Sequence, residues 1–222
     1  MSAGRPASGA PHTAPRLVFA TGNAHKIEEL RAILAPLLPG LPEGAIARMS
    51  DFDVAEPVED GATFEENAFI KARALCEATG VASVADDSGL CVDLMGGAPG
   101  ILSARWCGHH GDDAANLDLL LAQLDDIPDR LRGAAFVSAA ALVTPEGEEF
   151  VEIGRVHGTL VHERRGTNGF GYDPVFVPDG HSRTTAEMSP EEKNALSHRG
   201  IAFRALAPAL VDVLSRAPRT PL

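Results

Sequence analysis

The sequence has little of the material from which covalent staples and membrane anchors are made. Its 222 residues include three cysteines, Cys76, Cys91 and Cys107, and this odd number shows no C-x-x-C spacing. A disulfide framework and a zinc site of paired cysteines are therefore disfavoured, and a reducing, cytoplasmic setting fits best. The longest apolar run, Ala134 to Val143, is roughly half of the ~20 residues that a membrane-spanning helix requires.

Lysine is scarce, and the overall charge is acidic. Of nineteen basic residues only three are lysine, Lys26, Lys71 and Lys193, and the formal net charge is −12 at pH 7. A general nucleic-acid binder is disfavoured, because affinity for a polyanion comes largely from basic side chains. A small phosphorylated ligand is compatible with this charge if the basic groups are concentrated locally. Each lysine is then a candidate for a place that needs a compact ammonium group; codon bias and chance are the alternative.

The length and composition predict one domain of α/β class. A hydrophobic share of 45% is ordinary for a globular protein of this size. Residues 1–15 are rich in Gly, Pro, Ser and Ala and predict a disordered tail. Residues 16–222 contain no linker rich enough to separate independent domains, so we expect a single two-lobed domain with a cleft between the lobes.

Apolar runs and helical periodicity alternate along the chain, which is the basis of the α/β assignment. The expected strands are Leu17–Ala20, Val81–Ala85, Ala134–Val143, Phe150–Val156 and Val175–Val177. The expected helices are Ala24–Leu34, Phe64–Thr79, Asp113–Leu124, Pro190–His198 and Ile201–Leu214. The turn sequence Pro145-Glu-Gly between two expected strands predicts a hairpin, so the sheet is expected to be mixed.

The stretch Thr21-Gly-Asn-Ala-His-Lys26 stands where the first expected strand passes into the first helix. Backbone N–H groups at such a turn form an anion site, and Lys26 would neutralise the anion. The spacing matches neither a Walker A loop nor a dinucleotide-binding glycine motif. A simple turn with a solvent-facing lysine is the alternative.

Carboxylates gather in two places along the sequence. Asp86 and Asp87, followed by Ser88, stand at the C-terminal end of an expected apolar strand, where α/β proteins place ligands. Glu56 and Glu59 lie in a loop just before the helix that carries Lys71. Mg²⁺ is commonly held by one or two carboxylates and substrate phosphates, and a carboxylate can also polarise a water. Neighbouring aspartates that merely form a turn are the alternative.

Two further segments have the chemistry of a nucleotide-base pocket. The loop 166–174 is rich in glycine and carries Phe170 and Tyr172, the only tyrosine, so it offers aromatic faces for stacking a base. Near its expected helix end, Lys193 is followed by His198 and Arg199. A flexible hairpin and a solvated helix end are the respective alternatives.

Six blocks in this order resemble one family, the inosine triphosphate pyrophosphatases, also called dITP/XTP pyrophosphatases. The blocks are TGNAHK (21–26), EDGATFEENAFIKA (59–72), ADDSGL (85–90), GGAPGILSARW (96–106), GFGYDPVF (169–176) and EKNALSHRG (192–200). The resemblance runs from about Arg16 to Leu210. All three lysines fall inside the blocks.

The resemblance implies an elongated mixed sheet with two lobes around an active-site cleft, a homodimer, and release of pyrophosphate by Mg²⁺-assisted attack of water on the α-phosphorus. It implies that Asp87 is the general base and a metal ligand, with Glu59 or Glu56 as the second ligand. The implied substrate-binding residues are Thr21, Gly22, Asn23, Ala24, His25, Lys26, Lys71, Ser88, Phe170, Gly171, Tyr172, Asp173, Lys193, His198 and Arg199.

The sequence departs from the family pattern at two positions. Val58 stands where some members carry the metal-binding glutamate, and Asn168 stands where glycine is common. A pyrophosphatase for other modified bases and a nucleotide-binding regulator without turnover stay open as alternatives. The segment around Trp106 is interpreted as structural or dimer-related, and His109-His110 with Asp112-Asp113 as a solvated loop and helix cap.

Overall fold

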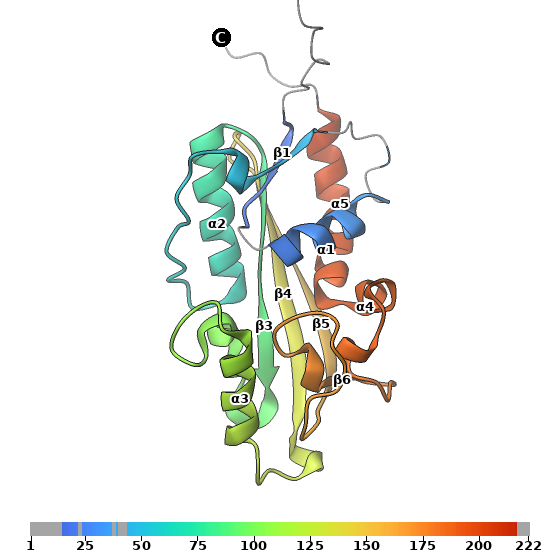
Figure 1. The fold of residues 1–222 in the computed structure, drawn as a ribbon. Coiled ribbons are helices and arrows are strands. Elements are labelled where there is room, and N and C mark those ends of the chain that lie inside the picture. Colours follow the sequence, from blue (N-terminus) through green and yellow to red (C-terminus); the bar gives the residue numbers. More distant parts are fainter. Residues whose placement is uncertain (1–14, 22–23, 37–38, 40–43, 217–222) are drawn as a thin grey trace, which may run out of the picture.

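The computed structural model describes residues 15–21, 24–36, 39 and 44–216. A six-stranded sheet of order β2-β1-β3-β4-β5-β6 forms its centre (Figure 1). The strands are β1 (Leu17–Phe19), β2 (Ile46–Arg48), β3 (Ser83–Val92), β4 (Gly133–Val143), β5 (Glu149–Leu160) and β6 (Phe176–Pro178). The helices are α1 (Ala24–Leu34), α2 (Phe64–Thr79), α3 (Asp113–Gln123), α4 (Pro190–Leu196) and α5 (His198–Ser215).

The sheet is mixed, as the sequence predicts. Strand β1 pairs in parallel with β2 and β3, whereas β3 to β6 pair antiparallel in succession. The expected hairpin joins β4 to β5, and Gly147 in its turn has a φ of 87°, a left-handed conformation that favours glycine. Because β3, β4 and β5 are the long strands, they run the length of the molecule in Figure 1.

Both faces of the sheet are covered by helices. Leu17 and Phe19 pack in a core that includes residues of α1 and α5, whereas the intervening Val18 packs with residues of α2. This alternation follows from the two-residue period of a strand. A third core, at the far end of β3 and β4, contains Leu117 and Leu120 of α3. Helices α1, α2 and α5 thus pack toward one end of the long strands, and α3 packs toward the other end (Figure 1).

Three expectations about the elements need correction. The third strand does not end at Ala85 but continues to Val92, so Asp86 and Asp87 lie in its middle. The helix expected over 190–198 ends at Leu196, and a new helix starts at His198 with the Ser197 side chain as its cap. Strand β2, which has only three residues, was not expected.

The side chain of Thr63 caps α2 by accepting from the Glu66 N–H, and Ser189 caps α4 within a full capping box. In the part of the chain that is described, none of the helices combines the length and apolar character that crossing a bilayer needs. The expected disordered tail lies outside the described residues, apart from Pro15.

Candidate active site

Two cavities meet beside Lys26, at the middle of β3. The first, here called the lysine cavity, measures about 160 Å³ and is lined by residues that include Thr21, Lys26, Glu56, Glu59 and Lys71. The second, here called the aromatic cavity, measures about 120 Å³. Its lining includes Lys26, Ser88, Phe170, Tyr172, Lys193 and His198. Lys26 and Ala104 line both cavities, so the two form neighbouring parts of one site.

Asp86 is the buried charge that pairs with Lys26, which lines both cavities. It is 1% exposed, and its Oδ2 lies 3.1 Å from Lys26 Nζ and 3.0 Å from Arg199 Nε. The Ser88 hydroxyl also donates to Oδ2, at 3.2 Å. Burial by itself would raise the pKa of Asp86, but the charges of Lys26 and Arg199 outweigh it and hold the pKa well below its usual range. Asp86 is therefore ionised and joins α1, β3 and α5.

Asp87, the next residue, faces the other side of the sheet and contacts α2. Its Oδ1 lies 3.1 Å from Lys71 Nζ, and its Oδ2 accepts a hydrogen bond of 3.2 Å from Asn67 Nδ2. Burial raises the pKa of Asp87 above its ordinary value, and Lys71 and Lys26 only partly offset this. For Lys71 burial lowers the pKa, but Asp87, Asp86 and Glu59 reverse the effect and raise it. Asn67 and Lys71 stand four residues apart on α2 and contact the same carboxylate.

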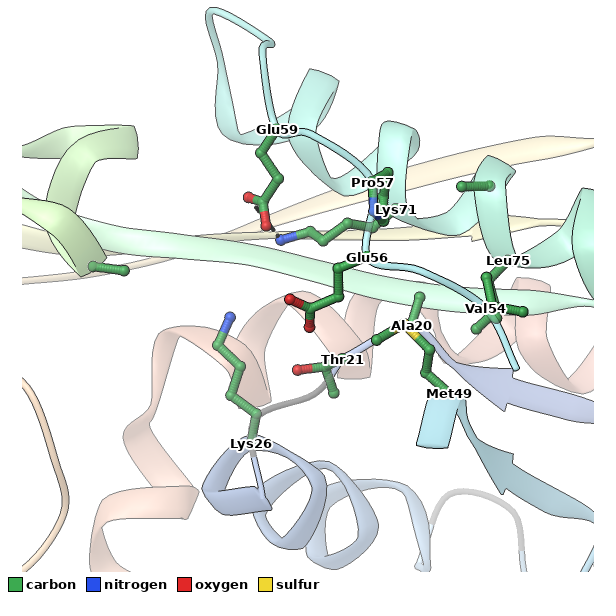
Figure 2. A pocket seen from close by; sticks show the side chains of 12 residues that line it. Ala20, Thr21, Lys26, Met49, Val54, Glu56, Pro57, Glu59, Lys71 and Leu75 are labelled. Atoms are coloured by element: carbon green, nitrogen blue, oxygen red, sulfur yellow. Dashed lines mark hydrogen bonds and ion pairs between the residues drawn. The ribbon is translucent and has the colours of Figure 1, made fainter. Parts of the chain in front are cut away.

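The acidic loop before α2 brings a second carboxylate to Lys71. Glu59 Oε2 lies 3.1 Å from Lys71 Nζ, so the same ammonium group contacts Glu59 and Asp87. Figure 2 shows the side chains of Glu56 and Glu59 directed into the lysine cavity, with Glu56 on the side of Thr21. Val58, the departure from the family pattern, is 80% exposed. Glu56 and Glu59 thus provide carboxylates where Val58 does not.

The donor set fits a divalent cation of the magnesium type. Glu59 and Asp87 already converge on one cationic group, and Asp86 Oδ1 is buried with no hydrogen-bond partner among the described residues. Hard cations prefer such carboxylate oxygens, and Mg²⁺ needs only one or two of them beside substrate phosphates. No cluster of three or more His, Cys, Asp or Glu side chains that could hold a metal occurs in the described ranges.

Lys26 projects from the first turns of α1 into both cavities, as Figure 2 shows for the lysine cavity. Burial lowers its pKa more than the neighbouring Asp86 raises it, so the pKa lies below its ordinary value. Thr21 lines the lysine cavity at the end of β1. The predictions for Gly22 and Asn23 lie outside the described residues, as do those for the side chains of Ala24 and His25.

Asp173 lines the aromatic cavity and contacts three other residues beside it. It is 3% exposed, and its Oδ2 accepts from Lys193 Nζ at 2.7 Å and from the Phe170 backbone N–H at 2.9 Å. Its Oδ1 accepts from the Thr185 hydroxyl at 2.8 Å. The Lys193 ammonium and the Arg199 guanidinium lie 4.9 and 5.2 Å from the centre of the Phe170 ring. Asp173 therefore fixes both the aromatic ring and a cation that contacts it.

His198 and Arg199 are buried at the start of α5, which corrects the solvated helix end considered from the sequence. Their exposures are 6% and 4%, and the His198 ring stacks on Phe136 with centroids 4.9 Å apart. Burial and the nearby Arg199 and Lys193 charges keep the pKa of His198 well below its usual value, so the imidazole is neutral. Gly154 of β5 allows this approach, because a Cβ there would lie 2.0 Å from the His198 carbonyl oxygen.

Tyr172 does not present the exposed stacking face that its loop suggests. It is 5% exposed, packs in the core with residues of α3, and donates its hydroxyl to the Ser103 carbonyl at 2.9 Å. Burial raises the pKa of this phenol further above its ordinary range. Asn168 is likewise anchored, since its side-chain amide donates to the Met188 carbonyl at 2.9 Å. Phe170 is therefore the aromatic residue of the loop that can meet a ligand.

Several residues of the site lie outside the sequence predictions. Asn67 contacts Asp87, and Asp113 accepts a hydrogen bond of 3.0 Å from the backbone N–H of Gly171. Asp112 caps α3, as predicted, by accepting from the Ala115 N–H. The sequence pattern could have indicated Asn67, because it lies four residues before Lys71 and therefore on the same face of the helix. The contact of Asp113 with Gly171 could not be predicted, because an aspartate next to the capping residue Asp112 has the same local pattern whether or not it makes such a contact.

Comparison with known proteins places this arrangement in a family. The Ham1 family model matches residues 17–209. The chain belongs to the Ham1 family. A relative from Streptomyces avermitilis named dITP/XTP pyrophosphatase is 59% identical over 199 residues, 90% of this chain and 98% of the relative.

Solved structures of Ham1-family proteins show the same fold. A nucleoside-triphosphatase / dITP/XTP pyrophosphatase from Mycobacterium abscessus is 56% identical, with a TM-score of 0.72, over 87% of this chain and 98% of that one. A HAM1 protein from Coxiella burnetii is 37% identical, with a TM-score of 0.78, over 89% of this chain and 99% of that one. The mixed α/β sheet with flanking helices expected from the sequence is thereby confirmed.

Proposed function

We propose that this Ham1-family chain hydrolyses purine nucleoside triphosphates with a hypoxanthine or xanthine base, namely dITP, ITP and XTP, to the nucleoside monophosphate and pyrophosphate. Relatives more than 50% identical over most of the chain are named dITP/XTP pyrophosphatase. The observation that carries the proposal is the position of Lys26, which lines a cavity of lysines and carboxylates and a cavity with an aromatic wall. A triphosphate and its base need such a pair of neighbouring subsites.

In this proposal the lysine cavity binds the phosphates. Thr21 to Lys26 contact phosphate oxygens at the entry to α1, and Lys71 neutralises charge from α2. Charge neutralisation is essential, because the polyanionic substrate repels an incoming nucleophile. Ser88, which lines the aromatic cavity, contacts the nucleotide between its phosphates and its base.

The carboxylates Asp87 and Glu59 would hold Mg²⁺, with Glu56 as the alternative to Glu59. When bound, Mg²⁺ supplies neutralisation of phosphate charge and lowers the pKa of water in its coordination shell. Lys71 lies 3.1 Å from both Glu59 and Asp87. With Mg²⁺ on these two carboxylates, the Lys71 ammonium group would instead contact the phosphates.

Asp87 is the general base of the proposed reaction. It accepts a proton from the water that attacks the α-phosphorus, the bond from that phosphorus to the bridging oxygen breaks, and pyrophosphate leaves with the electron pair. A carboxylate whose pKa is raised by burial is a better proton acceptor than an exposed one. Asn67 and Lys71 contact its two oxygens.

In the proposed reaction the aromatic cavity binds the base of the nucleotide and selects among bases. Phe170 supplies the stacking face, Asp173 and Lys193 hold that ring, and Gly171 and Tyr172 complete the wall. The backbone N–H groups of Phe170 and Gly171 already donate to carboxylates, so they are not the donors for O6 of the base. His198 and Arg199 are the proposed donors, and an adenine amino group at the same place would leave a buried donor without a partner.

A homodimer, a cytoplasmic location, the absence of nucleic-acid and membrane partners, and the division into a tail and one two-lobed domain belong to the same proposal. All three cysteines are unpaired, which is consistent with a reducing compartment.

The proposal is tested by measuring pyrophosphate release from dITP, ITP, XTP, ATP, GTP and dTTP, with and without Mg²⁺, for the wild type and Asp87→Asn. Mg²⁺-dependent release from dITP, ITP and XTP that is lost in the variant supports it. Preference for another base would replace the substrate assignment. Binding of ITP without turnover of any triphosphate would indicate a regulator. Arg199→Ala with an unchanged ITP/ATP ratio would remove Arg199 from base discrimination.

A further inference from the structure

Asn67 connects two parts of the site that come from different elements. It lies on α2, is 1% exposed, and uses both ends of its carboxamide. Its Oδ1 accepts a hydrogen bond of 2.9 Å from the backbone N–H of Gly61, and its Nδ2 donates one of 3.2 Å to Asp87 Oδ2. One side chain therefore ties the acidic loop to the carboxylate on β3.

The carboxylate of Asp87 depends on this contact for its orientation. The terminal torsion of an aspartate side chain is broad, so a carboxylate held at one oxygen can rotate. Lys71 holds Oδ1 at 3.1 Å, but Lys71 also contacts Glu59 and has a flexible stem. Asn67 holds Oδ2 from a short side chain on a packed helix face. Together the two contacts leave the carboxylate one direction.

The acidic loop is seated on the same carboxamide. A Cβ at Gly61 would lie 2.6 Å from Asn67 Oδ1 and 2.7 Å from the Glu66 Cβ, so no side chain fits between the loop and the helix. Glu59 stands two residues before Gly61. Lys71 bridges Glu59 and Asp87 directly, and Asn67 links the loop that carries Glu59 to Asp87 by a second route.

We propose that Asn67 is a positioning residue, which fixes the direction of the Asp87 carboxylate and the place of the 56–61 loop beside it. The inference rests on the proposed function, because it assigns Asn67 to the reaction that Asp87 serves. Residues that orient a reacting or metal-binding group commonly change activity by about 10- to 100-fold when they are replaced.

Two substitutions separate the two contacts. In Asn67→Asp an oxygen remains to accept from Gly61, but the donor to Asp87 is lost when the new carboxyl group is ionised, so kcat is measured at the alkaline end of the active pH range. In Asn67→Ala both contacts are lost. We expect both variants to lower kcat for dITP by about 10- to 100-fold, with KM within about threefold of the wild type. Only Asn67→Asp adds a charge. A lower kcat in both variants therefore cannot be explained by electrostatic repulsion between residue 67 and Asp87.

Amide hydrogen exchange gives a readout that does not depend on activity. We expect exchange at Gly61 and in the peptide covering 56–61 to accelerate in Asn67→Ala and to stay as in the wild type in Asn67→Asp. Gly61→Ala breaks the same link from the loop side, since the added Cβ would displace the carboxamide. It should lower kcat without any change at position 67.

Asn116 provides the matched control. It is also 1% exposed and on a helix, and its Oδ1 accepts from the Cys107 backbone N–H at 2.7 Å. Its Nδ2 has no partner among the described residues. Asn116→Asp therefore makes the same chemical change in an equally buried place without removing a donor to Asp87, and we expect its kcat to stay within twofold of the wild type.

The outcomes are distinguishable. A wild type that releases no pyrophosphate overturns the proposed function, and the inference falls with it. An active wild type whose kcat is retained in both Asn67 variants overturns the inference alone. An equal fall of kcat in Asn67→Asp and Asn116→Asp, or a rise in KM with kcat unchanged, also overturns it, because the effect is then general destabilisation or lost substrate binding.

Discussion

The buried charge of Asp86 should be needed for stability, and Asp86→Asn removes that charge with little change in shape. Two cations then remain beside it, since Lys26 and Arg199 both lie within 3.1 Å of Asp86 Oδ2. Their side chains are only 15% and 5% exposed, so water cannot fully solvate them. Removing one partner of a buried ion pair typically costs about 3–5 kcal/mol. We expect the lower end, about 3 kcal/mol, because asparagine still offers an acceptor oxygen.

The predicted loss is measurable by thermal unfolding. For a chain of this length 1 kcal/mol shifts Tm by about 2–4 °C, so Asp86→Asn should lower Tm by roughly 6–12 °C. Tripolyphosphate should restore part of this loss, because its charge can replace that of Asp86 beside Lys26. If the variant binds the anion tenfold more tightly than the wild type, the added stabilisation is about 1.4 kcal/mol at saturation.

Asp118→Asn is the control, because it removes the same charge from an exposed pair with Arg164, in which Asp118 is 70% exposed. Such a pair contributes about 0–1 kcal/mol, so Tm should move little. A Tm for Asp86→Asn within about 2 °C of the wild type, together with an equal tripolyphosphate shift in the two proteins, would refute the role of Asp86 as the counter-charge of the site.

Three further predictions concern other parts of the fold. His198 has a folded pKa well below its unfolded value of about 6.5, so the unfolded state binds the proton more readily and stability falls as pH drops below about 6.5. Between pH 7.5 and pH 5.0, the free energy of unfolding measured in urea should fall by about 1–2 kcal/mol more in the wild type than in His198→Gln. Equal falls in the two proteins would contradict this role of His198. Arg132 is fully buried and donates to the carbonyls of residues 124, 160 and 161. Arg132→Met should lower the free energy of unfolding in urea by about 3–5 kcal/mol, whereas Arg73→Met, at an exposed position, should lower it by less than about 1 kcal/mol. Similar losses in the two variants would contradict a structural role for the buried hydrogen bonds of Arg132. Tyr172→Phe removes the bond to the Ser103 carbonyl and should lower Tm by roughly 3–6 °C while the KM for dITP stays within about twofold, whereas an unchanged Tm would favour a direct contact with the base.

Most of the helices could be predicted because their signals are local. The Thr63-x-x-Glu66 pattern at its start and Gly80 at its end define α2, and the structure has the same bounds. The break between α4 and α5 was expected at residues 199–200, but it lies at Ser197, because no local signal ends the helical pattern of 190–198 at Leu196. Ser197 ends one helix and caps the next, and only the tertiary fit of α5 against Gly154 reveals the new start.

The residues that gather at the candidate site could be predicted in part, but not their contacts. The three lysines and the Asp-Asp pair indicated an anion and a metal, and Lys26, Lys71 and Asp87 do lie together. The role of Tyr172 could not be predicted, because an aromatic residue in a glycine-rich loop has the same local pattern whether it faces a ligand or the core. Its partner Ser103 is distant in sequence, and only the folded chain brings the two together.

The length of β3 explains how one ligand can meet groups from both faces of the sheet. Consecutive strand residues point to opposite faces, so Asp86 and Ser88 contact Arg199 of α5, whereas Asp87 contacts Lys71 of α2. The described pairing of β3 with β1 ends at Val84, so the edge of β3 beside these three residues is not covered by β1. A ligand at that edge can therefore reach side chains from either face. A strand that ended at Ala85, as the sequence suggested, would have placed both aspartates in a turn, without this division of roles between the faces.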